Sequence, residues 1–244
     1  MDTASFPSVP VPRQPLKVLL LTGENNHDWQ ATTPVIQAIL ERGGAFRATV
    51  ETRPRELRPD TFAPYDLILS NWNTFPDNPA GIWSDETRAA FLNHIADGNG
   101  FVVVHAGGSM FYDWPEYQRL IGATWGKTSC HGAIFPFMAT IVDRTHPVTR
   151  DLPEQFAVTD EVWARMAVKG ERQILVTAPS DRSKRDEPVC FTTCYDQGRC
   201  FNLVLGAEAD GMRNPHFQTL LRRGCEWAAT GQVTERTQNH HPNT

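Results

Sequence analysis

Phe101–Ser109 reads FVVVHAGGS, and this segment decides the fold. Four consecutive apolar residues are typical of a short strand that is buried on both faces of a sheet. A histidine follows at once, and two glycines then allow the backbone to turn tightly. The segment therefore predicts a central parallel strand that ends in a polar loop.

Three further strands are expected before this segment, at 17–21 (KVLLL, a continuous apolar run), 46–51 and 66–70 (DLILS). Helices are expected between them, one capped by Thr33 and one capped by Ser84. This alternation predicts an α/β fold: a three-layer sandwich with a mostly parallel central sheet and helices on both faces. Ligands of such sheets bind beyond the carboxyl ends of the strands, so the site is expected in the loops that follow them.

The second half of the chain is richer in strands and ends in a helix near 214–231. Strands are expected at 134–142, 173–178, 189–195 and 200–205. We expect one α/β domain over residues 16–232, a flexible N-terminal arm at 1–15 and a disordered tail at 233–244.

The composition narrows the classes of function and location. The chain has 244 residues, 40% of them hydrophobic, and a formal net charge of −5, which gives no reason to expect a nucleic-acid partner. No apolar stretch is long enough to predict a membrane span or a secretory signal. Five cysteines without a CxxC pair favour reduced thiols and a cytoplasmic location. The oligomeric state is not readable, and a homo-oligomer stays open.

His105 and the glycine turn behind it form the first candidate for chemistry. Histidine is suited to general acid–base catalysis and to metal binding. The N–H groups of Gly107 and Gly108 can stabilise a developing negative charge, and Ser109 can bond a ligand. The competing interpretation is a glycine-rich turn after a core histidine.

The loop after the first strand holds the second candidate, Asn26-His27-Asp28. Parallel strands end along one edge of a sheet, so His27 is expected to lie near His105. Asp28 can orient an imidazole, and Asn26 can bind a substrate. The competing interpretation is a polar surface loop.

Three residues further along the chain complete the set. Trp114 can form an aromatic wall for a sugar, and His131 is a third imidazole. Glu161 can act as a base or a metal ligand, or simply as an acid in solvent. By contrast, Asp113 and Glu116 are interpreted as a capping box rather than as catalytic acids.

A divalent metal ion such as zinc is an open alternative to metal-free acid–base chemistry. The donors suited to it are His27, His105, His131 and Glu161. Their wide separation in the sequence gives no spacing signature, so both alternatives stand.

The chain resembles the ThuA-like (trehalose utilisation) family over most of residues 16–230. The resemblance rests on the motifs LLLTGENNHDW, FVVVHAGGSMF, DWPEYQRLIGATW, RTHPVTRDLP, TDEVW and LRRGCEWA, together with His131. It implies a fold like that of class I glutamine amidotransferases, related to flavodoxin-like sheets. No cysteine stands in the turn at 106–109, so glutamine hydrolysis by a thiolate there is not expected. A hydrolase that uses Cys130 instead is the least favoured reading.

The resemblance also implies an activity on carbohydrates. Family members are associated with the use of trehalose and other disaccharides, including routes through 3-keto-sugars. His27, His105, His131 and Glu161 match recurring polar positions. Relatives often carry Leu-Gly-His after the last strand, where this chain has Leu205-Gly206-Ala207.

We therefore expect a hydrolase or lyase that acts on a disaccharide, a glycoside or its 3-keto derivative, with a small-molecule carbohydrate as the partner. The alternative is a sugar-sensing or partner-binding module that has kept the fold and lost the chemistry.

Overall fold

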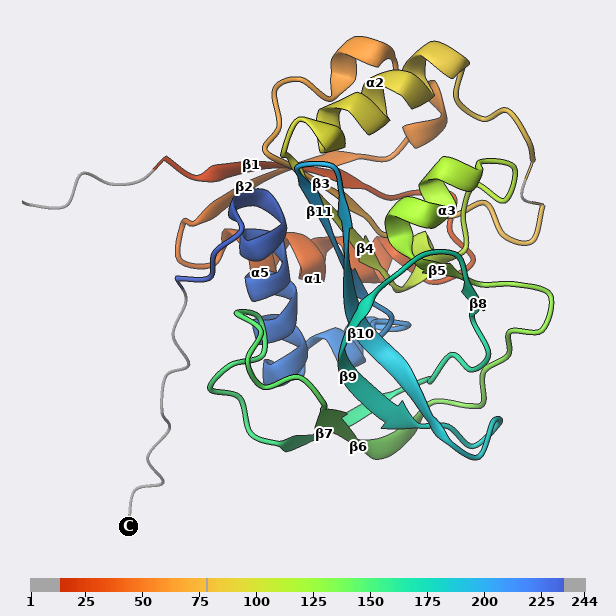
Figure 1. Ribbon diagram of the computed structural model, residues 1–244, viewed down its shortest axis with the longest axis vertical. Coiled ribbons are helices and arrows are strands. Elements are labelled where there is room, and N and C mark those ends of the chain that lie inside the picture. The colour runs from red at the N-terminus through yellow and green to blue at the C-terminus, as the bar shows by residue number, and fades with distance from the viewer. Residues whose placement is uncertain (1–13, 78, 235–244) are drawn as a thin grey trace, which may run out of the picture.

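The computed structural model describes residues 14–77 and 79–234. Nearly all of the expected arm and most of the expected tail lie outside these residues. The described chain forms helices on the two faces of one large sheet (Figure 1), as expected of an α/β sandwich.

Five parallel strands form one half of the nine-stranded sheet. In spatial order they are β2 (Phe46–Glu51), β1 (Leu16–Leu21), β3 (Leu67–Ser70), β4 (Gly100–Val104) and β11 (Gly198–Leu203). With β11 as the fifth parallel strand, this is the 2-1-3-4-5 order of flavodoxin-like sheets. The order changes direction between β1 and β3, so the loops that follow these strands diverge and leave room for a ligand.

Four antiparallel strands extend the sheet beyond β11. They are β10 (Asp186–Tyr195), β9 (Gln173–Pro179), β6 (Phe135–Ile141) and β7 (Gln155–Asp160). A separate antiparallel pair joins β5 (Ala123–Thr124) and β8 (Ala167–Val168). The expected strands of the second half are present as β6, β9, β10 and β11, whereas β7 was not expected. It lies at the edge of the sheet, far from β4 in strand order.

Helices cover both faces of the parallel half. On one face, α1 (Trp29–Glu41) and α5 (Pro215–Thr230) pack with Leu20 and other alternate strand residues. On the other face, α2 (Asp85–Ala96) and α3 (Pro115–Ile121) lie over a second core that includes Leu19. Adjacent leucines of β1 thus enter opposite cores, which explains the unbroken apolar run. A short helix, α4 (Ala209–Met212), precedes α5.

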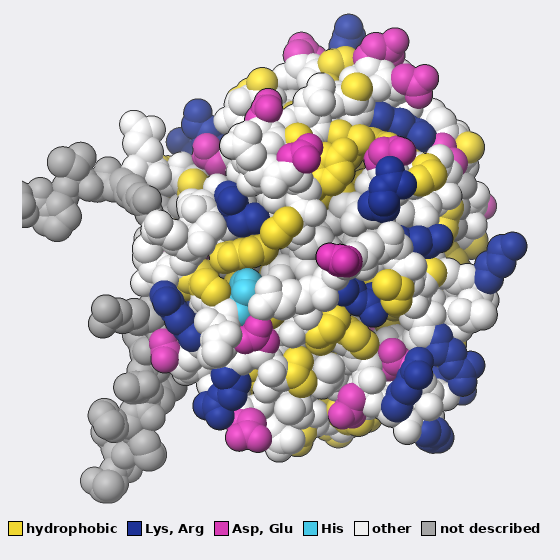
Figure 2. Space-filling model, viewed as in Figure 1, with side chains coloured by type: hydrophobic (Ala, Val, Ile, Leu, Met, Phe, Trp, Pro, Cys, Tyr) yellow, Lys and Arg dark blue, Asp and Glu magenta, His cyan; other side chains and the backbone are white. Residues whose placement is uncertain are grey.

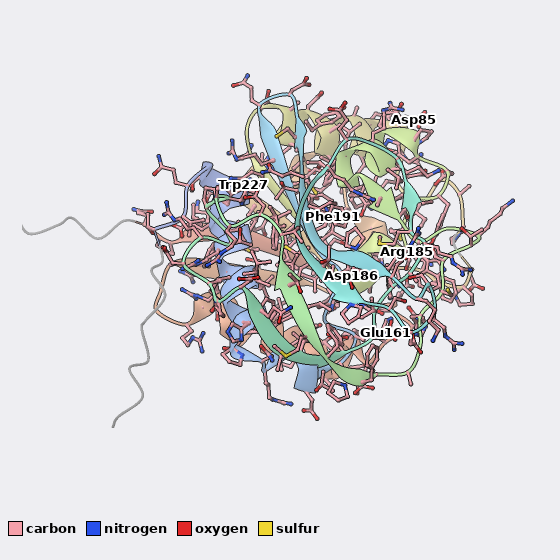
Figure 3. The ribbon with its side chains drawn as sticks, turned by 60° about the horizontal axis from the view of Figure 1, so that its bottom comes forward. Asp85, Glu161, Arg185, Asp186, Phe191 and Trp227 are labelled. Atoms are coloured by element: carbon pink, nitrogen blue, oxygen red, sulfur yellow. The ribbon has the colours of Figure 1, made fainter. Side chains whose placement is uncertain are left out.

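The labelled side chains show where these layers lie. In Figure 3, Phe191 lies on β10 within the sheet and Trp227 lies on α5 to one side of it. On the face drawn in Figure 2, acidic and basic side chains are mixed, and hydrophobic side chains form several separate patches. No helix among the described residues is long and apolar enough to cross a membrane.

One of the two expected helix caps differs in the structure, and the other is confirmed. The helix α1 begins at Trp29 because Asp28 caps it and accepts the N–H of Ala31, while Thr33 lies inside the helix with its hydroxyl against that of Thr22. The expected Ser84 cap of α2 is confirmed, since its hydroxyl accepts the N–H of Thr87.

The prediction of a capping box at Asp113 is wrong. No side chain caps α3, which begins at Pro115. Asp113 instead binds the guanidinium of Arg88 at 2.6 Å and accepts the N–H of Gly81 at 3.0 Å. This carboxylate therefore joins α2 to the start of α3, a contact that no local sequence pattern reveals.

Candidate active site

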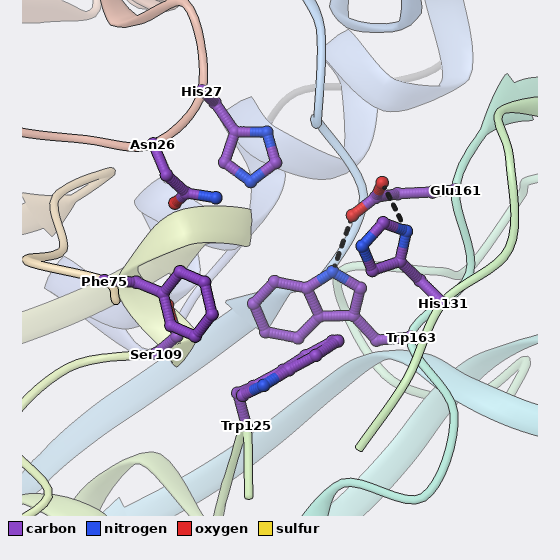
Figure 4. Close-up of a pocket in the computed structure, with 8 residues that line it drawn as sticks. All are labelled: Asn26, His27, Phe75, Ser109, Trp125, His131, Glu161 and Trp163. Atoms are coloured by element: carbon purple, nitrogen blue, oxygen red, sulfur yellow. Dashed lines mark hydrogen bonds and ion pairs between the residues drawn. The ribbon is translucent and has the colours of Figure 1, made fainter. Parts of the chain in front are cut away.

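A pocket lies beyond the carboxyl ends of the parallel strands and encloses about 340 Å³, part of it open to solvent. It is lined by Asn26, His27, Phe75, Ser109, Trp125, His131, Glu161 and Trp163 (Figure 4). The loop after β1 supplies the first two of these residues, and the segment after β7 supplies Glu161 and Trp163. Residues from five separate stretches of the chain thus meet at one place.

Glu161 reaches this place because the chain turns back over the sheet after β7. Trp163 packs with Ala123, Phe191 and Val204, so the segment 161–164 crosses above β10 and the end of β11. This crossing brings an edge-strand residue beside the end of β4, where His105 lies.

The carboxylate of Glu161 is buried, with 6% of the residue exposed. Both of its oxygens contact polar side chains. Its Oε1 accepts the indole N–H of Trp163 at 2.8 Å and lies 3.2 Å from Nε2 of His105. Its Oε2 lies 2.9 Å from Nδ1 of His131. Figure 4 shows the contacts with Trp163 and His131 as dashed lines. Glu161 therefore joins two imidazoles and one indole.

His105 lies behind the pocket, where 1% of the residue is exposed. Its Nδ1 lies 2.5 Å from the carbonyl oxygen of Val204, and a carbonyl can only accept, so Nδ1 carries the proton. The ring also packs against Trp163, with ring centroids 4.7 Å apart. These contacts aim Nε2 at Glu161.

His27 lines the pocket and meets His105 edge to face, with ring centroids 4.5 Å apart. The side chain of Asn25 accepts the backbone N–H of His27 at 2.8 Å and so fixes the loop. His131 is more open, with 43% of its side chain exposed. Its Nδ1 also lies 2.8 Å from the carbonyl oxygen of Gly132, so this nitrogen donates its proton to acceptor oxygens.

Burial and mutual contact set the charges of this cluster. Burial, together with the neighbouring His105, lowers the pKa of His27 to about 4. Burial alone would lower the pKa of His105, but the close contact with the negatively charged carboxylate of Glu161 raises it above its ordinary value. Burial opposes the ionisation of Glu161, yet the contacts with His105 and Trp163 lower its pKa to about 2. Without a metal ion, the site thus holds a neutral His27 and an ionised Glu161 at neutral pH, and Glu161 favours the protonated form of His105.

The glycines after His105 are required by close packing. His105–Gly108 form one 3₁₀ turn. A Cβ atom on Gly107 would lie 2.5 Å from the backbone oxygen of Ser70, and one on Gly108 would lie 3.1 Å from the ring of Trp163. The proposed role of their N–H groups in charge stabilisation stays a prediction.

Ser109 and Asn26 are linked through Asn73, which sequence reasoning missed. The amide of Asn73 donates to Oδ1 of Asn26 at 2.8 Å and to the hydroxyl oxygen of Ser109 at 2.9 Å. Its oxygen accepts the backbone N–H of Phe75 at 3.3 Å. Asn73 thus positions three residues that line the pocket.

Two of the expected substrate-binding residues lie elsewhere. Trp114 is 4% exposed and packs in the aromatic core with Phe111 and Tyr117, under the guanidinium of Arg88. Its ring is apolar enough to be taken into the core, so it does not line the pocket. Asp28 caps α1 and is exposed.

The aromatic residues of the pocket were not predicted as site residues. Trp163 lies within the TDEVW motif, but a tryptophan there predicts a core residue equally well. Trp125 meets Trp163 edge to face at 4.9 Å, and Phe75 lies at the rim with 39% of the residue exposed. No spacing pattern distinguishes such residues from ordinary core aromatics. Cys130 does not line the pocket, and its backbone pairs with that of Ala164.

Of the four residues considered as metal ligands, three bring their donor atoms together. Among the described residues, one ligand atom each from His27, His105 and Glu161 lies within 4.8 Å of the other two. His131 contacts the opposite oxygen of Glu161 and is not in this group. Two imidazoles and a carboxylate form a donor set that fits a divalent transition metal.

Ala207 follows the last parallel strand, where the family resemblance led us to expect a histidine. The N–H groups of Gly206 and Ala207 donate to the buried carboxylate of Asp160, at 2.7 Å and 3.3 Å. A backbone hydrogen bond joins Ala207 to His27. Ala207 therefore contacts the site through its main chain, and Asp160 holds that segment in place.

The sheet order and the histidine–carboxylate cluster at its strand ends define the class: a flavodoxin-like α/β protein with a polar pocket at the switch point. The sequence model of a family described as trehalose utilisation (ThuA) matches residues 17–228. The chain belongs to this ThuA family. None of the curated proteins compared with the chain matches it.

Solved structures agree with the family. A ThuA-like protein of Parabacteroides merdae ATCC 43184 is 31% identical, with a TM-score of 0.81 over 92% of this chain and 94% of that one. A ThuA-like protein of Bacteroides uniformis ATCC 8492 is 18% identical, with a TM-score of 0.69 over 94% and 97%. A protein of Salmonella typhimurium LT2 described as cytoplasmic is 11% identical, with a TM-score of 0.65 over 87% and 99%. The last two show the fold alone.

Proposed function

We propose that the protein is an enzyme of carbohydrate breakdown that acts on a disaccharide, a glycoside or its 3-keto derivative. The observation that carries the proposal is the contact of one buried carboxylate, Glu161, with two imidazoles at the wall of an aromatic pocket. Family membership supports a carbohydrate as the substrate class.

The pocket lining suits a sugar without charged groups. Trp125, Trp163 and Phe75 offer apolar ring surfaces, and the C–H faces of a pyranose pack well against such rings. The hydroxyl and amide groups of Ser109 and Asn26 can bond the polar edges. None of the eight residues that line the pocket is a lysine or an arginine. We therefore infer that unphosphorylated sugars are preferred over sugar phosphates.

Proton transfer to the substrate falls to residues that reach the pocket. His27 and His131 line it, whereas His105 is buried behind it and acts through Glu161. In a 3-keto-sugar the carbonyl makes the neighbouring C–H acidic. A base removes that proton, the glycosidic C–O bond breaks as the C=C bond forms, and an acid protonates the leaving oxygen. No redox partner is needed.

The proposal is tested with a 3-keto-disaccharide such as 3-keto-trehalose, with release of the monosaccharide followed by NMR. We expect turnover by the wild type and a loss of roughly 100-fold in His131→Asn, within the usual range for an acid–base group. The matched control is His216→Asn, an imidazole on α5 that does not line the pocket and should leave the rate unchanged. Binding of the sugar without turnover would favour the sugar-sensing module instead.

We also infer a cytoplasmic location. All five cysteines are free, and Cys190, Cys200 and Cys225 are buried. Free thiols are typical of a reducing compartment. Cell fractionation tests this, and recovery outside the cytoplasm would overturn it.

A further inference from the structure

We propose that His27, His105 and Glu161 bind one divalent first-row transition metal ion, with zinc as the first candidate. This inference deepens the proposed function, because it adds a cofactor to the same pocket. The binding itself can be measured without any sugar.

The three donor atoms lie close enough together for one ion to gather them. The three atoms lie within 4.8 Å of one another, and Nε2 of His105 lies 3.2 Å from Oε1 of Glu161. Two ligands of a tetrahedral zinc ion, with bonds of about 2.0–2.1 Å, are about 3.3 Å apart. The His105–Glu161 pair thus already has the spacing of two ligands on one ion.

The hydrogen bonds leave a position for a cation between these groups. The carbonyl of Val204 takes the Nδ1 proton of His105, so in the neutral ring Nε2 carries a lone pair. That nitrogen is buried and has no hydrogen-bond partner of good geometry among the described residues. It faces a carboxylate oxygen and the ring of His27. Groups that all offer lone pairs repel one another unless a cation lies between them, either a second proton or a metal ion.

The contacts around the donors are those that usually orient metal ligands. A metal-binding histidine donates its other N–H to a carbonyl or carboxylate, as His105 does to Val204. A metal-binding carboxylate is itself hydrogen-bonded, as Glu161 is by Trp163 and His131. These partners hold the donors in place before any ion arrives.

The donor set selects the kind of ion. Two imidazoles with one carboxylate suit zinc and its first-row neighbours, whereas magnesium and calcium prefer oxygen ligands alone. Since His27 and Glu161 line the pocket, the ion would face the sugar there and supply a Lewis acid for a carbonyl or hydroxyl oxygen. His27 would then serve as a ligand, and proton transfer would fall to His131.

The test uses the full chain, without an affinity tag and stripped of metal by a chelator. Cobalt(II) is titrated in and followed by its visible absorption, and zinc is counted by elemental analysis after dialysis. We expect one ion per chain, with a cobalt spectrum typical of nitrogen and oxygen ligands, and no comparable binding of magnesium. His105→Ala and Glu161→Gln should lose stoichiometric binding, a drop in affinity of roughly 100-fold or more. Glu161→Gln keeps the size of the side chain, so it remains informative if His105→Ala fails to fold.

The controls separate this site from other histidines. His131→Asn should still bind one ion, about 10-fold more weakly, because it removes an outer contact and not a ligand. His216→Asn should bind as the wild type does. A double variant, His240→Ala with His241→Ala, removes the pair near the C-terminus. Binding that disappears in this double variant, that persists in His105→Ala, or that is absent from the wild type would overturn the proposal.

The outcomes for metal and function are distinguishable. Turnover by metal-free protein that fails to bind zinc or cobalt would overturn the metal site and leave the proposed function intact. Stoichiometric metal binding without turnover of any sugar would support the metal site and overturn the proposed function.

Discussion

His105 and Glu161 form a buried pair, with Nε2 of the imidazole 3.2 Å from Oε1 of the carboxylate. One residue follows the central strand β4 and the other follows the edge strand β7. The pair therefore depends on the fold of the whole second half of the chain. Because both groups are out of solvent, their charges act more strongly on each other than a surface pair would.

Packing at the glycine turn predicts unequal effects for two similar changes. Gly107→Ala brings a Cβ atom to 2.5 Å from the rigid backbone oxygen of Ser70, so it should lower the free energy of unfolding. We expect a loss of about 1–3 kcal/mol, the usual cost of overpacking. Gly108→Ala meets a side chain rather than the backbone, the ring edge of Trp163 at 3.1 Å, so its loss should be smaller. Chemical denaturation measures both, and equal losses would contradict the structural account.

The amide of Asn73 should affect substrate binding more than stability. Asn73→Asp keeps the shape but removes the N–H groups that hold Asn26 and Ser109. We expect a rise in KM of roughly 10-fold with a smaller change in kcat, because about 1–1.5 kcal/mol is the usual worth of such a hydrogen bond. Asn73→Ala removes the same N–H groups without adding a charge, so it separates the loss of these hydrogen bonds from the effect of charge. An unchanged KM in Asn73→Asp would show that the pocket does not depend on this network.

Two tryptophans should separate stability from binding. Trp114 is packed in the aromatic core, so Trp114→Leu should lower the free energy of unfolding by about 2–4 kcal/mol and leave KM nearly unchanged. Trp125 lines the pocket, so Trp125→Leu should raise KM with a smaller loss of stability. Thermal unfolding and steady-state kinetics on both variants check this. A larger rise in KM in Trp114→Leu than in Trp125→Leu would show that Trp114 contributes to substrate binding.

Asp143 predicts an acid-dependent part of the stability. Burial is the largest single influence and opposes its ionisation, but hydrogen bonds from Thr145, Gln173 and His146 together lower the pKa of Asp143 to about 2. A lowered pKa in the folded state means that the stabilisation is fully present above the ordinary value and is lost as pH falls from about 4 through about 2.

The measurement compares the unfolding midpoints of wild type and Asp143→Asn across this range. The difference between them should be constant near neutral pH and should shrink below pH 4 or so. A difference that does not depend on pH would mean that the charge of Asp143 contributes nothing.

The sequence predicts the parallel half of the fold well, for a physical reason. The strands near Leu19 and Val103 are buried on both faces, so they appear as unbroken apolar runs. The same logic predicts that His27 and His105 approach each other, because both follow parallel strands that end at one edge. The structure places their rings in contact.

The rest of the site depends on contacts that carry no local signal. Glu161 follows an edge strand and reaches His105 only because the chain crosses back over the sheet. Asn73 acts through hydrogen bonds to residues far away in the sequence. Trp163 acts through a hydrogen bond to Glu161 and through burial of its ring. A single polar or aromatic residue in a loop has many uses, so neither could be assigned a role before the chain was folded.

The most direct test of the account is the rate at which Glu161→Gln converts a 3-keto-disaccharide that the wild type converts. Glutamine keeps the size of the side chain but cannot carry the negative charge that both imidazoles contact. We predict a fall in kcat of roughly 100-fold or more, with the sugar still bound and the protein still folded by circular dichroism. A variant that is folded and turns over at the wild-type rate would contradict the claim that this carboxylate organises the active site.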